Sequence, residues 1–93
     1  MVVRPALVVS DRGLGLKGSL AWVAMITNAA REQWPGDILI ADSLTLGLIV
    51  ASKVRTAKVT AIEAGNATKL GVLDPGTLHV VRTILAANLG CSF

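Results

Sequence analysis

Apolar and polar residues alternate in short blocks along this chain, and the blocks predict strands and helices in turn. Residues 5–10 and 37–42 are short runs rich in valine, leucine and isoleucine, which is typical of buried strands. Between them, positions 20, 23, 27, 30 and 34, all apolar except Thr27, recur at steps of three and four. This spacing predicts a helix from Ser19 to about Gln33, ended by Trp34-Pro35-Gly36 because proline cannot continue a helix.

The second half of the chain continues the alternation. Ser43 is a candidate N-cap for a helix running towards Thr56, although positions 44, 46, 48 and 50 also alternate as a strand would. Residues 58–64 predict a third strand. Asp74-Pro75 is typical of a helix start, and the apolar stripe at positions 78, 81, 85 and 89 predicts a last helix that ends at Gly90.

This order of elements predicts an α/β fold. Strands that are apolar on both faces and alternate with helices favour a parallel sheet covered by helices. We therefore expect one small three-layer Rossmann-like domain over residues 1–93, with strand order 2-1-3 and three helices. A short sheet with two free edge strands, in a chain that is 53% hydrophobic, also favours a homo-oligomer or a larger assembly.

Composition and charge exclude several classes of protein. No apolar run reaches the roughly 18 residues of a membrane span, and the single cysteine, Cys91, predicts an inert thiol in a cytoplasmic protein. The net charge of +3 is mild. Lys53, Arg55 and Lys58 form a cluster of cations that suits phosphate, but a solvated helix end is the preferred interpretation. Because only 3% of residues are aromatic, nucleic acid is an unlikely partner.

The segment with the clearest chemical implication is Gly13-Leu14-Gly15-Leu16-Lys17-Gly18. It has the form G-x-G-x-x-G between a predicted strand and a predicted helix, where backbone amides can approach a pyrophosphate. Arg12 and Lys17 would lie close to the phosphates. Asp42, at the end of the second predicted strand, would accept hydrogen bonds from a ribose. The alternative is that the glycines only permit a tight turn.

Three pieces of the chain resemble short-chain dehydrogenases/reductases. Residues 6–16 resemble the first strand and glycine loop of that family, Val59 to Gly65 its fourth strand, and Leu73 to Phe93 the following helix. The resemblance implies a Rossmann-type fold that binds NAD or NADP, with Gly65 beside the cofactor ribose and Asn88 in the place of the asparagine that supports the family's proton relay. The chain has no tyrosine, whereas catalysis in that family requires one.

We therefore expect a nucleotide- or dinucleotide-binding module that is not catalytically complete by itself, and whether the chain is an enzyme stays open. The expected cofactor-binding residues are Arg12, Gly13, Gly15, Lys17, Gly18, Asp42 and Gly65. No metal site is predicted, because His79 is the only histidine. Two alternatives remain: a structural protein that assembles through exposed apolar surface, and a basic nucleic-acid-binding dimer.

Overall fold

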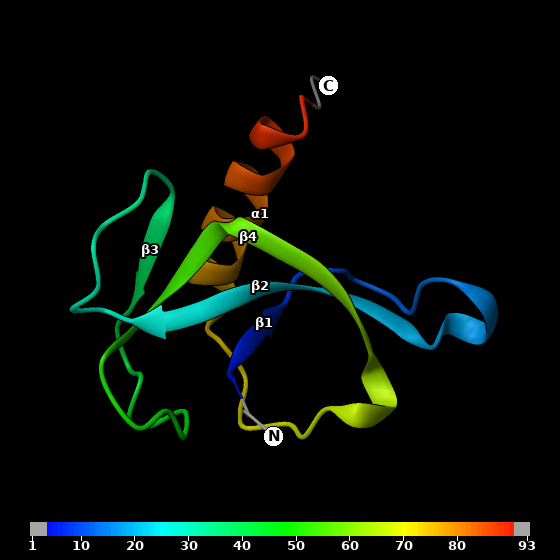
Figure 1. The fold of residues 1–93 in the computed structure, drawn as a ribbon, viewed down its shortest axis with the longest axis horizontal. Coiled ribbons are helices and arrows are strands. Elements are labelled where there is room, and N and C mark those ends of the chain that lie inside the picture. The colour runs from blue at the N-terminus through cyan, green and yellow to red at the C-terminus, as the bar shows by residue number, and fades with distance from the viewer. Residues whose placement is uncertain (1–3, 91–93) are drawn as a thin grey trace.

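Four antiparallel strands form one bent sheet, and a single long helix packs behind it (Figure 1). The computed structural model describes residues 4–90. The strands are β1 (Ala6–Val8), β2 (Leu20–Asn28), β3 (Asp37–Ile40) and β4 (Ser52–Glu63), in the sheet order β1-β2-β4-β3. Two short 3-10 turns, η1 (Leu16–Gly18) and η2 (Ala64–Asn66), and the helix α1 (Pro75–Asn88) complete the fold. Within residues 4–90, no helix is long and apolar enough to cross a membrane.

A break in the pairing of β2 with β4 bends the sheet. Ala24 pairs with Val59, but the next residue, Met25, pairs with Arg55, so that residues 56–58 of β4 have no partner in β2. Such a bulge turns a strand sharply and redirects its side chains. Figure 1 shows the resulting corner in β4. Inside the bend, the Thr56 hydroxyl is buried and donates to the Gly36 carbonyl over 2.7 Å.

The core lies between the sheet and α1. Ala24, Val54 and Val81 are fully buried there, and Ile26 packs against them. Because successive side chains of a strand point to opposite faces, Met25 and Thr27 on β2 lie on the face away from α1. The remaining buried apolar members of the core are Val9, Ile40 and Leu48.

The predicted helix from Ser19 to Gln33 is wrong: this segment forms β2 and the turn that follows it. Its apolar positions fit helical steps because a central strand of a bent sheet is covered on both faces, so Val23 and Ala24 are both buried. Such a continuous apolar run fits both the periodicity of a helix and that of a strand, but its β-branched and aromatic residues favour a strand.

The helix predicted from Ser43 to Thr56 is also wrong. Residues 41–47 form turns and β4 begins at Ser52. Ser43 caps no helix; its hydroxyl donates to the Ile40 carbonyl over 2.8 Å and accepts from the Ser52 amide over 2.9 Å, which closes the loop between β3 and β4. The predicted strand at residues 58–64 is confirmed as the second half of β4.

These two errors overturn the predicted fold class. The sheet is antiparallel with order β1-β2-β4-β3, not parallel with order 2-1-3, and one α-helix replaces the three expected. When strands follow one another directly, hairpins and loops connect them and no crossover helix is needed. The strands at residues 5–10 and 37–42 are confirmed. The last helix is confirmed too: Asp74 accepts from the Thr77 amide at its start, and Gly90 takes a positive φ after its end.

Candidate functional site

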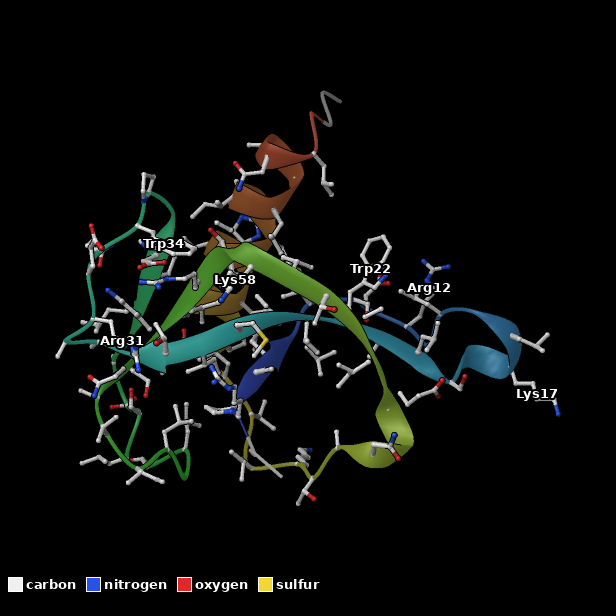
Figure 2. All side chains as sticks on the ribbon, in the orientation of Figure 1. Arg12, Lys17, Trp22, Arg31, Trp34 and Lys58 are labelled. Atoms are coloured by element: carbon white, nitrogen blue, oxygen red, sulfur yellow. The ribbon has the colours of Figure 1, made fainter. Side chains whose placement is uncertain are left out.

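Four cationic side chains meet in one hollow near the end of β2. We call this cavity of about 130 Å³ the basic pocket. Figure 2 shows that the labelled Arg31 and Lys58 lie at the same end of the molecule, far from Arg12 and Lys17. The bulge in β4 brings Lys58 to this site, since it lies among the residues without a partner in β2. The lining residues are Arg4, Met25, Ile26, Thr27, Arg31, Arg55 and Lys58.

A buried ionic network holds Arg55 in the wall of the pocket. Its Nε donates to Asp37 Oδ1 over 3.2 Å and its Nη2 to Oδ2 over 2.9 Å, in a bidentate pair. Lys53 Nζ approaches the same Oδ2 at 3.3 Å. The Asp37 side chain has no exposed surface, and those of Lys53 and Arg55 are nearly as buried. Asp37 is therefore the counter-ion of two buried cations.

Asp37 stays ionised in this environment. Burial by itself raises the pKa of the carboxyl group. Hydrogen bonds from Arg55, from the Trp34 amide and from Lys53 act in the opposite direction, and together they lower the pKa to about 2. At neutral pH the network of Asp37, Lys53 and Arg55 thus carries one net positive charge. Arg55 contributes part of this charge to the wall of the basic pocket.

The same two cations fix the loop between β2 and β3, which carries Arg31. Lys53 Nζ donates to the Arg31 carbonyl over 2.7 Å and to the Glu32 carbonyl over 3.3 Å. Arg55 Nη2 donates to the Glu32 carbonyl over 2.6 Å. Because buried groups on β4 hold the carbonyls of Arg31 and Glu32, the backbone of the loop is fixed at Arg31.

Trp34 completes the arrangement from the end of that loop. The Arg55 guanidinium carbon lies 4.0 Å from the centre of the Trp34 ring, and Lys58 Nζ lies 5.9 Å from it. Both distances fall within the range of cation–π attraction. The Trp34 amide also donates to Asp37 Oδ2 over 2.9 Å. The indole thus helps to orient two of the four cations of the basic pocket.

The chemistry of this site is that of an anion receptor. Arginine offers several N–H donors in a fixed geometry that suits phosphate oxygens, and lysine adds a compact charge. Thr27, half-buried in the lining, supplies a hydroxyl that can donate or accept. Within the part of the chain that the structure describes, no three His, Cys, Asp or Glu side chains gather to hold a metal ion.

The glycine loop singled out from the sequence lies elsewhere, in the hairpin between β1 and β2. The Leu14 amide donates to the Leu20 carbonyl over 2.9 Å, and the Leu20 amide donates back to Leu14 over 3.0 Å. The Gly18 amide donates to the Gly15 carbonyl over 3.2 Å. These amides are already used, and no α-helix follows the loop, so it is no pyrophosphate cradle. Arg12, Gly13 and Lys17 belong to the same exposed hairpin.

The other two expected cofactor residues do not complete a dinucleotide site. Asp42 is exposed in the turns after β3, at the opposite end of the molecule from the hairpin loop (Figure 1). Gly65 lies in η2, which adjoins the start of β2 because the Ala64 amide donates to the Ser19 carbonyl over 2.9 Å. The hairpin loop and η2 are thus neighbours, but Asp42 is separate from both.

Sequence reasoning noted Lys53, Arg55 and Lys58 but placed them on a solvated helix end, and this interpretation is wrong. They lie on β4, where Lys53 and Arg55 are buried. The interpretation failed because Asp37, Arg31 and Arg4 are distant in sequence and only strand pairing brings them to β4. A signal was present in segment 52–63, which is rich in β-branched residues that favour a strand: Val54, Thr56, Val59, Thr60 and Ile62.

Two kinds of comparison relate the chain to known proteins. The model of the PemK-like, MazF-like toxin family of type II toxin-antitoxin systems matches residues 2–89. The crystal structure of MazE-MazF (Form-III) from Deinococcus radiodurans superposes with a TM-score of 0.71 at 23% identity, covering 96% of this chain and 87% of that chain. Form-II of the same complex gives 0.70 at 23% identity, with 96% and 83% covered. No curated protein sequence matches.

These findings correct the functional predictions. The resemblance to short-chain dehydrogenases/reductases is wrong, and the Rossmann-like dinucleotide module and its NAD or NADP cofactor are wrong with it. The view that nucleic acid is an unlikely partner is not supported, whereas the expected assembly has a counterpart in the MazE-MazF complexes. Since the family model spans almost the whole sequence, this chain belongs to the PemK-like, MazF-like toxins of type II toxin-antitoxin systems.

Proposed function

We propose that this chain is a toxin that binds single-stranded RNA in the basic pocket and cleaves its phosphodiester backbone. The observation that supports this most strongly is the convergence of Arg4, Arg31, Arg55 and Lys58 on one cavity. Four cations and no carboxylate in the lining favour a polyanion over any neutral or cationic ligand. Because the chain belongs to a toxin family, we expect its target to be a molecule whose loss harms the cell.

The rigidity of the pocket supports catalysis as well as binding. Arg55 is held by Asp37 and Trp34, and the Arg31 backbone is held by Lys53. Cations that are already oriented stabilise developing negative charge without having to reorganise during the reaction. A phosphate seated among them would gain a second negative charge in the pentacoordinate transition state, which is the stage at which these groups contribute most.

The proposed substrate is RNA rather than DNA. RNA carries its own nucleophile, the 2′-hydroxyl, next to each phosphate. In the proposed step the 2′-oxygen attacks phosphorus as its proton leaves to solvent, the bond from phosphorus to the 5′-oxygen breaks, and that oxygen takes up a proton. A 2′,3′-cyclic phosphate and a free 5′-hydroxyl result. Thr27, in the lining of the same pocket, carries the hydroxyl that would hydrogen-bond the reacting oxygens in this proposal.

An antitoxin protein is the proposed partner. The similar solved structures are complexes of MazE with MazF, and type II systems pair a toxin with a second component. Large apolar side chains stand exposed on this chain, among them Leu16 (85%), Ile49 (93%) and Val72 (69%). Such surface is typical of protein interfaces. Action on cellular RNA also supports a cytoplasmic location as part of this proposal.

Binding of a labelled, uncleavable 2′-O-methyl RNA tests the assignment of the pocket. Arg4→Ala and Lys58→Ala should each weaken binding and lower the salt dependence by about 0.7 in log–log slope, the value for one lost phosphate contact on a single strand. Lys69→Ala removes an equal charge from an exposed loop outside the pocket and serves as the matched control. Equal losses in all three variants would show that only net charge matters, which would contradict the proposal.

A further inference from the structure

A second cavity lies at the other end of the molecule, between the hairpin loop and α1. It has a volume of about 310 Å³ and shares no residue with the basic pocket. Figure 2 shows Trp22 and Arg12 at this end, with Trp34, Lys58 and Arg31 at the other. It is lined by Val9, Ser10, Asp11, Leu14, Trp22 and Arg82, and we call it the Trp22 pocket.

Trp22 gives this cavity an aromatic wall. Although it lies on a central strand, 50% of its surface is exposed. Its backbone is fixed on both sides: the amide donates to Ser10 Oγ over 3.1 Å, and the carbonyl accepts from the Val9 amide over 2.9 Å. An exposed indole with a fixed backbone is a surface on which a flat base can stack.

The polar groups around the indole offer both an anion and donors. Asp11 accepts from Arg12 Nε through Oδ1 over 3.2 Å, so its other oxygen is not used in that pair. The hydrogen bond and charge of Arg12 lower the pKa of Asp11, and the charge of Arg82 contributes in the same direction. Arg82 donates to the Val9 carbonyl over 3.0 Å through Nε. Its terminal nitrogens are thereby left for a ligand.

We propose that the Trp22 pocket binds a guanine base. Guanine carries two N–H groups side by side on one edge, and a carboxylate such as Asp11 accepts from both. Its O6 and N7 are acceptors that suit an arginine, here Arg82. The ring stacks on Trp22. Adenine lacks the pair of adjacent donors, and pyrimidines offer a smaller ring for stacking, so both bind less tightly.

This proposal concerns the base alone and does not depend on cleavage in the basic pocket. The guanine can belong to a free nucleotide or to an RNA strand, since both present the same edge and the same ring. The pocket therefore either selects RNA sequences that contain guanine or senses a guanine mononucleotide. Competition between the two ligands distinguishes these sources.

The test is titration of the protein with GMP, IMP, AMP and CMP, followed by isothermal calorimetry and tryptophan fluorescence. GMP should bind about tenfold more tightly than AMP, the discrimination expected for one good bidentate contact. IMP, which lacks the exocyclic amine of guanine, should fall between them. Trp22→Phe should abolish the fluorescence change on binding while keeping most of the affinity. Equal affinity for all four nucleotides would overturn the proposal.

Asp11→Asn is the decisive variant. Asp11 is exposed, so the fold is retained. The new amide offers one donor and one acceptor, which suits adenine, and the preference should move from GMP towards AMP. An unchanged preference would contradict the proposal. Lys69→Ala, in an exposed loop outside both pockets, is the control and should leave the base preference as it is. Displacement of GMP by a guanine-containing RNA would assign the site to RNA, and lack of displacement would assign it to the free nucleotide.

Discussion

The two ends of the molecule use charged residues in opposite ways. At the basic pocket, Lys53, Arg55 and Asp37 are buried, and each is held by an ion pair and by at least one hydrogen bond to the backbone. In the hairpin loop, Arg12 and Asp11 pair at 3.2 Å with side chains 78% and 69% exposed. The first arrangement holds a cation in one defined position, as is needed to stabilise charge during a reaction. The second leaves the side chains exposed to solvent, where they are accessible to a ligand that is bound without being transformed.

This difference shows why the conspicuous motif misled and the functional site stayed hidden. Glycines in the hairpin satisfy local backbone geometry: Gly15 and Gly18 have positive φ, and a Cβ at Gly13 would collide with the Gly18 carbonyl. They are needed for the turn, with or without a ligand. The basic pocket has no local motif, because Arg4, Arg31 and Arg55 meet only after β1, β2 and β4 have paired.

The largest effect should come from Asp37→Asn. This change leaves Lys53 and Arg55 buried without their counter-ion, and loss of one partner of a buried ion pair costs about 3–5 kcal/mol. Urea denaturation followed by circular dichroism measures the loss. Asp42→Asn makes the same chemical change at an exposed site and should leave the midpoint nearly unchanged. A decrease of less than about 1 kcal/mol in the free energy of unfolding of Asp37→Asn would contradict a structural role for the network.

Acid should reveal the same network. The pKa of Asp37 is about 2 in the folded protein against 3.8 as the ordinary value, so the carboxylate stabilises the fold above pH 4 and this contribution is lost as the pH falls through 2. The difference corresponds to about 2 kcal/mol. Urea midpoints at pH 5, 3 and 2 should fall more steeply for the native chain than for Asp37→Asn. If the urea midpoints of the two proteins fell equally with pH, the result would contradict this role of Asp37.

Two glycines, Gly36 and Gly65, extend the comparison to the backbone, because an added Cβ meets different surroundings at each. Gly36 has a φ of 87°, and a Cβ there would lie 2.5 Å from the buried Thr56 Oγ1. Gly36→Ala should therefore destabilise the fold by about 1–3 kcal/mol. A Cβ at Gly65 meets nothing within 4 Å, so Gly65→Ala should be neutral or slightly stabilising. Thermal unfolding of the two variants measures the contrast, and similar melting temperatures would count against it.

The smallest effect should come from Arg12→Ala. Its ion pair with Asp11 is exposed to water on both sides, and such pairs contribute little to stability. The urea midpoint should not move measurably, and neither should RNA binding in the basic pocket. A clear loss of stability would mean that the hairpin loop is more tightly packed than its exposure indicates.

The sequence predicts local structure better than it predicts pairing. The cap at Asp74, the proline at the first position and the glycine after the end define α1 correctly, because all three signals act within a few residues. Segment 19–33 is misread because Leu20, Val23 and Thr27 satisfy a helical spacing, whereas the segment forms a strand in which the neighbours Val23 and Ala24 are both buried. When that strand is interpreted as a helix, the remaining strands alternate with helices, and the sequence then predicts a parallel sheet instead of an antiparallel one.

The site could be predicted only in part for the same reason. The cations at positions 53, 55 and 58 are visible in the sequence, but the burial of Lys53 and Arg55 depends on Asp37 on β3, and the position of Lys58 depends on the bulge in β4. No local rule gives that bulge. The Gly13–Gly18 motif, in contrast, is local, and its chemistry depends on whether a helix or a strand follows. Here a strand follows.

Cleavage of an RNA and of its all-2′-deoxy counterpart by the purified protein, resolved by product mass, tests the central claim most directly. We expect the RNA to be cut to fragments that end in a 2′,3′-cyclic phosphate, the DNA to stay intact, and Arg4→Ala to lose the cutting while Lys69→Ala keeps it. Cleavage of the DNA at a similar rate, or undiminished cleavage of RNA by Arg4→Ala, would contradict the account.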